Sequence, residues 1–318
     1  MKDVLVILPK SIGGRLTVSS IKDGFELNGY NVILLDELKD NPKNFLDCKY
    51  EFIIGYDFSP VKFKIDNARS EKTIAYFSDV IYSPASESYY KEYYKYLKNP
   101  DIYTFYWDRE LTKKENNPQI QYMPHFVNCK IYKDFKPAAV DVSFMGRFDT
   151  DLRLNTWLEL NKKLPEYKFK WYAIKRHYDD AFSRCKTQEE KNIIKNTYSG
   201  FIDNEKDMAD KINDTKIVYN INAQGESSLN YRTFQVLACK RLIISDNRKE
   251  LDLFDNILPI WQNADDLAEK IKYYLKNPDE YLNIVSKCQK IIIERNNSKN
   301  AVAKIINIAD KRQTIASR

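Results

Sequence analysis

The stretch Ser227–Asp246, SSLNYRTFQVLACKRLIISD, places a short helical pattern directly before a buried strand. Apolar residues from Phe234 to Ala238 follow helical spacing, and Leu242–Ile244 is a continuous run of β-favouring residues. A helix that leads straight into a buried strand is typical of α/β proteins with a parallel sheet. Arg232 and Gln235 fall in the first turns of this helix. A cation and an amide at that place need a reason other than core packing.

The same alternation of strand and helix patterns continues along the chain. Helical patterns lie between the apolar runs, notably at Leu152–Leu164 and Asp265–Leu275. Short apolar runs bounded by turn residues predict strands. In the first half these runs are Val4–Leu8, Asn31–Leu35, Phe52–Gly55, Thr73–Phe77, Ile102–Tyr106 and Gln121–His125, and in the second half Val140–Met145, Lys168–Tyr172, Ile217–Asn222, Leu242–Ser245 and Leu258–Trp261.

The two series of strands predict two Rossmann-like domains joined by one linker. Cys129–Ala139 is polar, contains Pro137 and reads as that linker. We expect an N-terminal domain over residues 1–128 and a C-terminal domain over residues 140–290. Residues 291–318 are expected to form a helical tail that packs back on the N-terminal domain.

Composition narrows the class of protein. The chain has 318 residues, of which 43% are apolar and 30% charged, and no apolar run reaches membrane-spanning length. Five cysteines without a CxxC pair and only two histidines argue against a zinc site, a disulfide framework or any other metal site, and they favour the cytoplasm. The net charge of +6 is spread among acidic residues, which permits an anionic partner without requiring one.

Open parallel sheets bind ligands beyond the carboxyl ends of their strands, so we looked for polar residues there. Gly13, Gly14 and Arg15 follow the first strand, where paired glycines allow a phosphate to approach the backbone, although a plain tight turn explains them equally well. Asp79 follows the strand TIAYF and is either a functional carboxylate or the N-cap of the next helix. No GxGxxG motif follows any predicted strand, which disfavours a dinucleotide-dependent dehydrogenase.

Two arginines bracket the start of a helix in the second half of the chain. In MGRFDTDLR, Gly146 ends a strand, and Arg147 and Arg153 follow it. Two guanidinium groups there can hold a diphosphate with forked hydrogen bonds. Ion pairs with Asp149 or Asp151 are the alternative explanation, particularly for Arg147.

The opening stretch carries a resemblance to a known family. Asn230, Arg232, Phe234, Gln235 and the following LAC, with a later ELxxxF, resemble the donor-site signature of GT-B glycosyltransferases. The chain is most similar to spore-maturation-type enzymes and to phage DNA β-glucosyltransferases, which share the spacing of Gly146 and Arg153 and a strand that ends in aspartate. The resemblance implies the GT-B fold, two Rossmann-like domains facing each other across a cleft.

Residue roles follow from the resemblance. Arg232 and Arg153 would bind the donor diphosphate, with Gly146, Arg147 and Asn230 beside them. Gln235 would face the ribose hydroxyls, where these families usually have glutamate. Asp79 would be the catalytic base, with Asp108 and His125 as runners-up. The chain departs from the family in lacking acids at both Ser227 and Gln235 and in having Lys240 where glycine is common.

The expected function is transfer of a sugar from a nucleotide sugar, with a UDP-sugar favoured, to an acceptor hydroxyl. We expect an inverting reaction that needs no metal or other cofactor, in the cytoplasm of a bacterial or phage-infected cell. A glycan, glycolipid or protein acceptor is favoured over a hydroxylated DNA base, and a catalytically inactive DNA- or glycan-binding module is the alternative from another class. The aromatic segment Glu87–Leu97 is either an acceptor-facing lid or an amphipathic helix.

Overall fold

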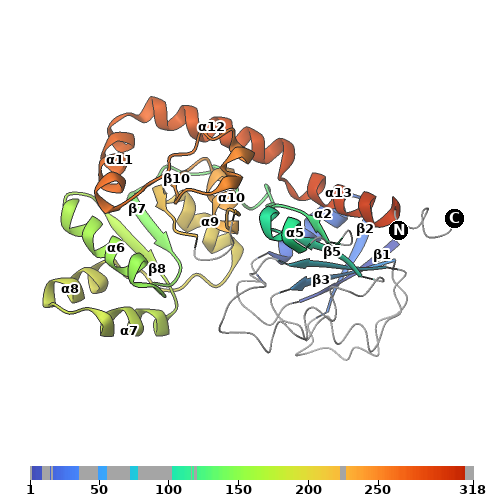
Figure 1. Ribbon diagram of the computed structural model, residues 1–318, viewed down its shortest axis with the longest axis horizontal. Coiled ribbons are helices and arrows are strands. Elements are labelled where there is room, and N and C mark those ends of the chain that lie inside the picture. The colour runs from blue at the N-terminus through green and yellow to red at the C-terminus, as the bar shows by residue number, and fades with distance from the viewer. Residues whose placement is uncertain are drawn as a thin grey trace. The chain divides into compact units, whose positions relative to one another are not determined.

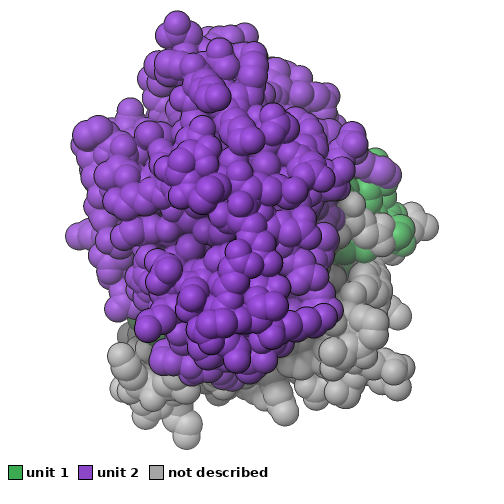
Figure 2. All heavy atoms as spheres, turned by 90° about the vertical axis from the view of Figure 1, so that its left-hand side faces the viewer, with its two compact units in different colours: residues 1–128, 224–230, 294–318 green, residues 129–223, 231–293 purple. Residues whose placement is uncertain are grey.

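The computed structural model describes residues 2–8, 15, 17–35, 49–55, 72–77, 102–115, 117, 120–222 and 227–311. The chain divides into two compact units, which Figure 2 shows in separate colours. Unit 1 comprises Met1–Asn128, Gln224–Asn230 and Glu294–Arg318, and unit 2 comprises Cys129–Ala223 and Tyr231–Ile293.

Unit 1 is built on a parallel sheet with the strand order β2-β1-β3-β4-β5-β6 (Figure 1). The sheet side chains that are buried are mostly β-branched and aromatic, as suits strands covered by helices. The strands are β1 (Lys2–Ile7), β2 (Tyr30–Leu35), β3 (Tyr50–Gly55), β4 (Lys72–Phe77), β5 (Ile102–Tyr106) and β6 (Ile120–Tyr122), and the helices are α2 (Val18–Leu27), α5 (Arg109–Glu115) and α13 (Ser298–Lys311).

The C-terminal helix α13 packs directly on α2, near the N-terminus of the chain. Gly24 makes the contact close, because a Cβ atom there would lie 2.3 Å from Val302 Cγ2 and 2.6 Å from the Ser298 carbonyl oxygen. Gly29 ends α2 with a φ of +84°, a conformation that glycine adopts without strain. The last helix of the chain is therefore part of the N-terminal unit.

Unit 2 contains a second parallel sheet with the strand order β10-β9-β7-β8. Its core is aromatic: the rings of Phe144 and Phe148 stack 4.8 Å apart, and Phe148 lies 4.4 Å from Trp171. The strands are β7 (Val140–Met145), β8 (Phe169–Tyr172), β9 (Thr215–Tyr219) and β10 (Leu242–Ile244). The helices are α6 (Asp151–Lys163), α7 (Lys175–Arg184), α8 (Gln188–Thr197), α9 (Glu205–Asn213), α10 (Tyr231–Ala238), the 3-10 helix η3 (Lys249–Phe254), α11 (Ala264–Lys276) and α12 (Pro278–Arg295).

The α/β architecture with parallel sheets confirms the sequence prediction, and three of the predicted strands show the largest differences in extent. The strand predicted over Gln121–His125 ends at Tyr122, because Pro124 has no N–H to continue the ladder. The strand predicted over Ile217–Asn222 ends at Tyr219. Beyond it, the backbone N–H of Asn220 still bonds to the Ile244 carbonyl, whereas that of Asn222 bonds to the Asp246 side chain. Leu258–Trp261 forms only a bridge between Ser245 and Ile260. No helix in the described ranges is long and apolar enough to cross a membrane.

Candidate functional site

The polar residues of unit 2 gather at the carboxyl edge of its sheet. Strands β7, β9 and β10 are parallel neighbours, so their carboxyl ends lie along one edge. Gly146 follows β7, and Asp246 lies two residues beyond β10. Helix α10 begins in the connection between β9 and β10, so its first turn starts from the same edge. This is the edge at which open α/β sheets bind ligands.

Arg153 is a buried arginine fixed at the start of α6. Thr150 caps this helix by accepting a hydrogen bond from the backbone N–H of Arg153. The Arg153 guanidinium donates to Asp149 Oδ1 at 2.8 Å and to the Ile221 carbonyl at 2.5 Å, just beyond β9. Its side chain is only 11% exposed. Arg153 therefore ties the β7–α6 turn to the end of the neighbouring strand.

Asp149 also binds Arg147, so the structure brings the two predicted arginines to one carboxylate. Arg147 Nε lies 2.8 Å from Asp149 Oδ2, and its side chain is 54% exposed. Asp151, the other predicted ion-pair partner, pairs instead with Arg184 of α7. The ion pairs proposed as the alternative explanation do form, yet two guanidinium groups share a single carboxylate. Arg147, Arg153 and Asp149 together therefore carry a net positive charge.

The backbone at Gly146 is accessible beside these arginines. A Cβ atom on Gly146 would have only the Phe144 ring within 4 Å among the described residues, at 3.6 Å or more. The Gly146 carbonyl accepts a hydrogen bond from Trp171 Nε1 at 2.8 Å, which holds the turn in place. A ligand group can thus approach this part of the backbone closely.

Arg232 and Gln235 lie on α10 and contact each other. Arg232 Nη1 donates to Gln235 Oε1 at 2.8 Å and also contacts the Met208 sulfur. Gln235 is 1% exposed, and its Nε2 donates to the Tyr132 hydroxyl at 2.6 Å. Burial lowers the pKa of Arg232, and its Nε is buried without a hydrogen-bond partner among the described residues. Arg232 forms no ion pair within the described part of the chain.

Tyr132 is a residue that the sequence analysis missed. It lies in the segment predicted as a linker, and it is 1% exposed. Burial raises the pKa of its hydroxyl well above the usual value, so it stays neutral and hydrogen-bonds Gln235. A tyrosine in a polar segment gives no sequence signal for this contact, because its partner is 103 residues away.

A second group of residues that the sequence analysis missed surrounds Asp246. Asp246 Oδ1 accepts from the backbone N–H of Asn222 at 2.9 Å and from its side-chain amide at 2.7 Å. Asp246 Oδ2 pairs with Arg248 Nε at 2.7 Å, and Arg248 Nη2 donates to the Asn222 carbonyl at 2.5 Å. These bonds fix the chain where it leaves β9. In the sequence, the signal for this group was the presence of polar residues directly after two apolar runs.

Asp108 of unit 1 is fully buried and hydrogen-bonded at both carboxylate oxygens. Oδ1 accepts from the backbone N–H of Leu111 at 2.9 Å, which caps α5. Oδ2 accepts from the backbone N–H groups of Ser227 and Ser228 at 3.1 and 3.3 Å. Asp108 thereby anchors the segment that precedes α10. Asn230, half-buried, is the last residue of that segment.

His125 is the other runner-up for the base, and it lies in the core of unit 1. Its side chain is 3% exposed, its Nδ1 lies 3.1 Å from the Tyr76 hydroxyl, and its ring packs 5.0 Å from Trp107. Burial lowers the pKa of His125 to about 3, so the imidazole is neutral at neutral pH. The contacts are those of a structural histidine.

Several predicted site residues lie outside the described residues. These are Gly13, Gly14, Asp79 and the segment Glu87–Leu97. Arg15 is described and half-buried.

Cavities lie at both edges of the unit 2 sheet. The smaller, of about 320 Å³, is lined by Arg147, Phe148, Asp149, Arg176, His177 and Asp180 beside the carboxyl edge. Burial, and then the charges of Arg147 and Arg176, lower the pKa of His177.

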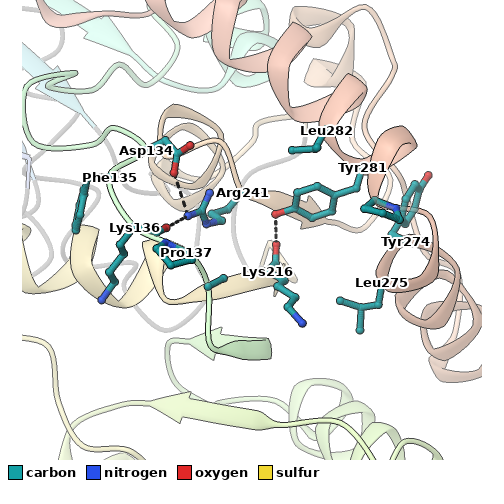
Figure 3. Close-up of a pocket in the computed structure, with 12 residues that line it drawn as sticks. Asp134, Phe135, Lys136, Pro137, Lys216, Arg241, Tyr274, Leu275, Tyr281 and Leu282 are labelled. Carbon is teal, nitrogen blue, oxygen red and sulfur yellow. Dashed lines mark hydrogen bonds and ion pairs between the residues drawn. The ribbon is translucent and has the colours of Figure 1, made fainter.

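The larger cavity, of about 680 Å³, lies where β7 and β9 begin, at the opposite edge of the sheet (Figure 3). There Asp134 faces Arg241 at 3.0 Å, and the Tyr281 hydroxyl donates to the Lys216 carbonyl at 2.6 Å. Lys216 itself pairs with Asp141, and Lys136 pairs with Asp210. The cations of this cavity are already paired with aspartates, so we do not assign an anion site to it.

Comparisons with known proteins agree with this arrangement. Residues 153–307 match the family model described as glycosyl transferase-like. In structure, the chain is similar to sucrose-phosphate synthase from Thermosynechococcus elongatus (TM-score 0.72, 12% identity, 100% of both chains covered). The chain has the GT-B fold. The match also contains Arg153, Arg232 and Gln235, which places these residues in the glycosyltransferase-like half.

Two further GT-B structures were solved with uridine nucleotides. HepE of Anabaena, in complex with UDP-glucose, has a TM-score of 0.68 and 10% identity, with 100% of both chains covered. An α-glucosyltransferase in complex with UDP and a DNA 13-mer has a TM-score of 0.71 and 14% identity, covering 98% of this chain and 100% of that one. At these identities the likeness shows the fold alone. No curated protein matches this chain significantly. The family match on this fold supports a glycosyltransferase-like enzyme.

Proposed function

We propose that the chain transfers a sugar from a UDP-sugar to an acceptor hydroxyl, and that unit 2 binds the donor. One observation carries the proposal: Arg232 has no carboxylate partner among the described residues, although burial opposes its charge. A diphosphate supplies the missing negative charge, and its oxygens match the forked donors of a guanidinium. The uridine nucleotides bound to HepE and to the α-glucosyltransferase support the choice of UDP.

The other residues of the carboxyl edge take complementary roles. Arg153, held by Asp149 and the Ile221 carbonyl, presents a rigid charge, whereas the exposed Arg147 can adjust to the ligand. Gly146 allows the diphosphate to approach the backbone. Fixed positive charges stabilise the leaving diphosphate, so the proposed reaction needs no metal ion. Asn230, and Gly13, Gly14 and Arg15 on the acceptor side, complete the proposed contacts.

We assign the catalytic base to Asp79 of unit 1. A base must be able to take a proton from the acceptor hydroxyl. Asp108 is buried with both oxygens occupied by N–H donors, and His125 is enclosed in the core, so neither has the accessibility that the step requires. In the proposed mechanism Asp79 acts as the one base in a direct displacement, so the transfer inverts the anomeric centre. Retention is the competing outcome, and it has support in a structural neighbour described as an α-glucosyltransferase.

For the acceptor we propose a glycan, glycolipid or protein. Several cations of unit 2 are paired with acids, which suits a compact acceptor better than a long polyanion. A hydroxylated DNA base is the second candidate, because the α-glucosyltransferase neighbour was solved with DNA. Cys129, Cys185, Cys239 and Cys288 are free thiols, which supports the cytoplasm as the place of action.

The test has two steps, binding and turnover. The wild-type protein is first screened against nucleotides and nucleotide sugars, and the absence of binding to all of them would remove the donor proposal. Turnover is then measured with simple glycosides, lipid-linked sugars and hydroxymethylated DNA. A protein that binds UDP-sugar but neither transfers nor hydrolyses it is an inactive binding module.

The assignment of the base is tested with Asp79→Asn. We expect turnover to fall by about two to four orders of magnitude with donor affinity unchanged. Asp108→Asn is the matched control, which should lose stability but keep turnover per folded molecule. Full activity in Asp79→Asn would move the search to Asp108 and His125. The anomeric configuration of the product decides between inversion and retention.

A further inference from the structure

Both ends of the Gln235 side-chain amide are used within unit 2. Arginine is only a donor, so the oxygen of the amide must face Arg232, and the nitrogen must then face Tyr132. Both contacts are short, at 2.8 and 2.6 Å, and the side chain is 1% exposed. Gln235 is therefore turned toward its own protein and not toward a ligand.

Among the described residues, the partners of Arg232 are all uncharged. Its Nη1 contacts the Gln235 oxygen and the Met208 sulfur, and Tyr132 and Tyr231 are the neighbours that influence its charge. The Arg232 side chain is partly buried, and a partly buried cation without a counter-ion among the described residues lowers stability unless a ligand provides the opposite charge. A neutral amide at position 235 orients the guanidinium without cancelling that charge.

We propose that Gln235 is a positioning residue that determines selectivity: it holds Arg232 with an uncharged amide, so α10 recognises an anion by charge and does not read the hydroxyls of the nucleoside sugar. The inference rests on the proposed donor site in unit 2 and adds to it a class of ligand. We therefore expect α10 to contribute equally to the affinity for nucleoside diphosphates with ribose and for those with 2′-deoxyribose.

A glutamate at this position would change both properties. Its carboxylate would pair with Arg232 at the same distance and compete with the phosphate oxygens for the guanidinium. Restoring the acid that the resembling families carry should thus weaken the binding of a bare anion. If Gln235 instead contacted the ribose, the same change would strengthen nucleotide binding. The two hypotheses therefore predict opposite changes in affinity for Gln235→Glu.

The experiment measures the dissociation constants of pyrophosphate, UDP and 2′-deoxy-UDP on the full chain by calorimetry. For the wild type we expect UDP and 2′-deoxy-UDP to agree within about twofold, since a site built around a hydroxyl rejects analogues that lack it far more strongly. For Gln235→Glu we expect pyrophosphate to bind about tenfold more weakly. Gln188→Glu, an exposed amide on α8, is the matched control and should shift affinity by less than about twofold.

A second variant separates charge from orientation. Gln235→Met is neutral and of similar length, and it loses both hydrogen bonds but leaves the Arg232 charge uncancelled. We expect it to weaken pyrophosphate binding by only about threefold, less than the glutamate does. It also keeps the test informative if the glutamate variant does not fold.

The outcomes separate this inference from the proposed function. Tighter pyrophosphate binding by Gln235→Glu, or a wild-type preference for UDP over 2′-deoxy-UDP of about tenfold or more, would overturn the inference but leave the donor site standing. Pyrophosphate binding that weakens as expected, with no added affinity from the nucleoside, would support the inference and remove the UDP proposal. A wild type that binds none of the three ligands would overturn both.

Discussion

Arg232 and Arg241 stand near opposite ends of α10, and their surroundings differ in kind. Arg241, 7% exposed, donates to backbone carbonyls that include those of Asn213 and Lys136, and it pairs with Asp134 at 3.0 Å. Arg232 has an amide and a thioether as its partners. Arg241 is thus completely used by the fold, whereas Arg232 keeps its charge and part of its hydrogen-bonding capacity. The partners, and not the residue type, distinguish a structural arginine from one available to a ligand.

The two edges of the unit 2 sheet also differ in how their cations are paired with acids. At the edge with the larger cavity, Lys216 and Arg241 each pair with a different aspartate, and Lys136 pairs with Asp210, which also pairs with Lys211. At the carboxyl edge, Arg147 and Arg153 share Asp149. We therefore place the proposed anion site at the carboxyl edge, although the larger cavity lies at the opposite edge.

The largest effect on stability is expected from Arg241→Ala. The change leaves several buried carbonyls without a donor, and we expect the free energy of unfolding of unit 2 to fall by about 3 kcal/mol. Urea denaturation followed by tryptophan fluorescence measures it, since Trp157, Trp171 and Trp261 lie in unit 2. UDP affinity per folded molecule should be unchanged. Lost affinity at unchanged stability would contradict the structural role of Arg241.

Ligand binding should stabilise unit 2 to a similar degree in the opposite direction. At a UDP concentration one hundred times its dissociation constant, we expect a gain of about 2.7 kcal/mol in the free energy of unfolding. The gain should persist in Arg241→Ala and fall to about 0.3–1.3 kcal/mol in Arg232→Ala at the same concentration, because the affinity of that variant is expected to be lower by about 1.5–3 kcal/mol. A thermal-shift titration with UDP tests all three proteins. Equal gains in all of them would show that neither arginine contacts the ligand.

Arg232→Ala should affect binding and spare the fold. It removes a charge-assisted hydrogen bond to the diphosphate, and we expect affinity for UDP to fall by about 1.5–3 kcal/mol. Stability should change little, because an uncompensated buried charge is removed together with its hydrogen bond. Arg232→Lys should recover only part of the affinity, since an ammonium cannot make the forked contact. Calorimetry measures the affinity, and unfolding of Arg232→Ala with normal binding by the folded fraction would make this arginine structural.

Much of the fold could be predicted from the sequence because its signals are local. The run Ile102–Tyr106 and the run Val140–Met145 form strands with those limits, since continuous apolar β-favouring residues depend on no distant partner. The end of β9 could not be predicted in the same way. Beyond Tyr219, the side-chain amides of Asn220 and Asn222 donate to Ser245 and Asp246. These partners are more than twenty residues away in the sequence.

The candidate site was predictable where the partners are close in sequence but not where they are distant. The spacing of Arg147 and Arg153 pointed to the β7–α6 turn, and the structure joins them through Asp149. The role given to Gln235 could not be checked from sequence, because its partner Tyr132 lies in a segment that reads as a linker. Whether a polar side chain faces a ligand or its own protein depends on such long-range contacts.

The smallest effect on stability is expected at Lys240, which lies between the two arginines in the sequence. Its substitution is also a control for the comparison of Arg232 with Arg241. Lys240 has a φ of +56°, and the N–H groups of Lys240 and Arg241 bond to the carbonyls of Leu237 and Val236. This is a Schellman motif, in which the left-handed position favours glycine. It explains why glycine is common there in the resembling families.

Lys240→Gly should raise the free energy of unfolding by about 0.5–1 kcal/mol, because relief of the backbone strain exceeds the added entropy of the unfolded chain. Lys240→Ala is the matched control: it removes the same charge but keeps the left-handed strain, so stability should stay within about 0.5 kcal/mol. Both variants should bind UDP as the wild type does, since Lys240 makes no ion pair within the described residues and has no proposed contact with the donor. Weaker UDP binding in both would mean that the total charge of unit 2 governs affinity. The contrast between Arg232 and Arg241 would then have to be explained by charge number and not by their partners.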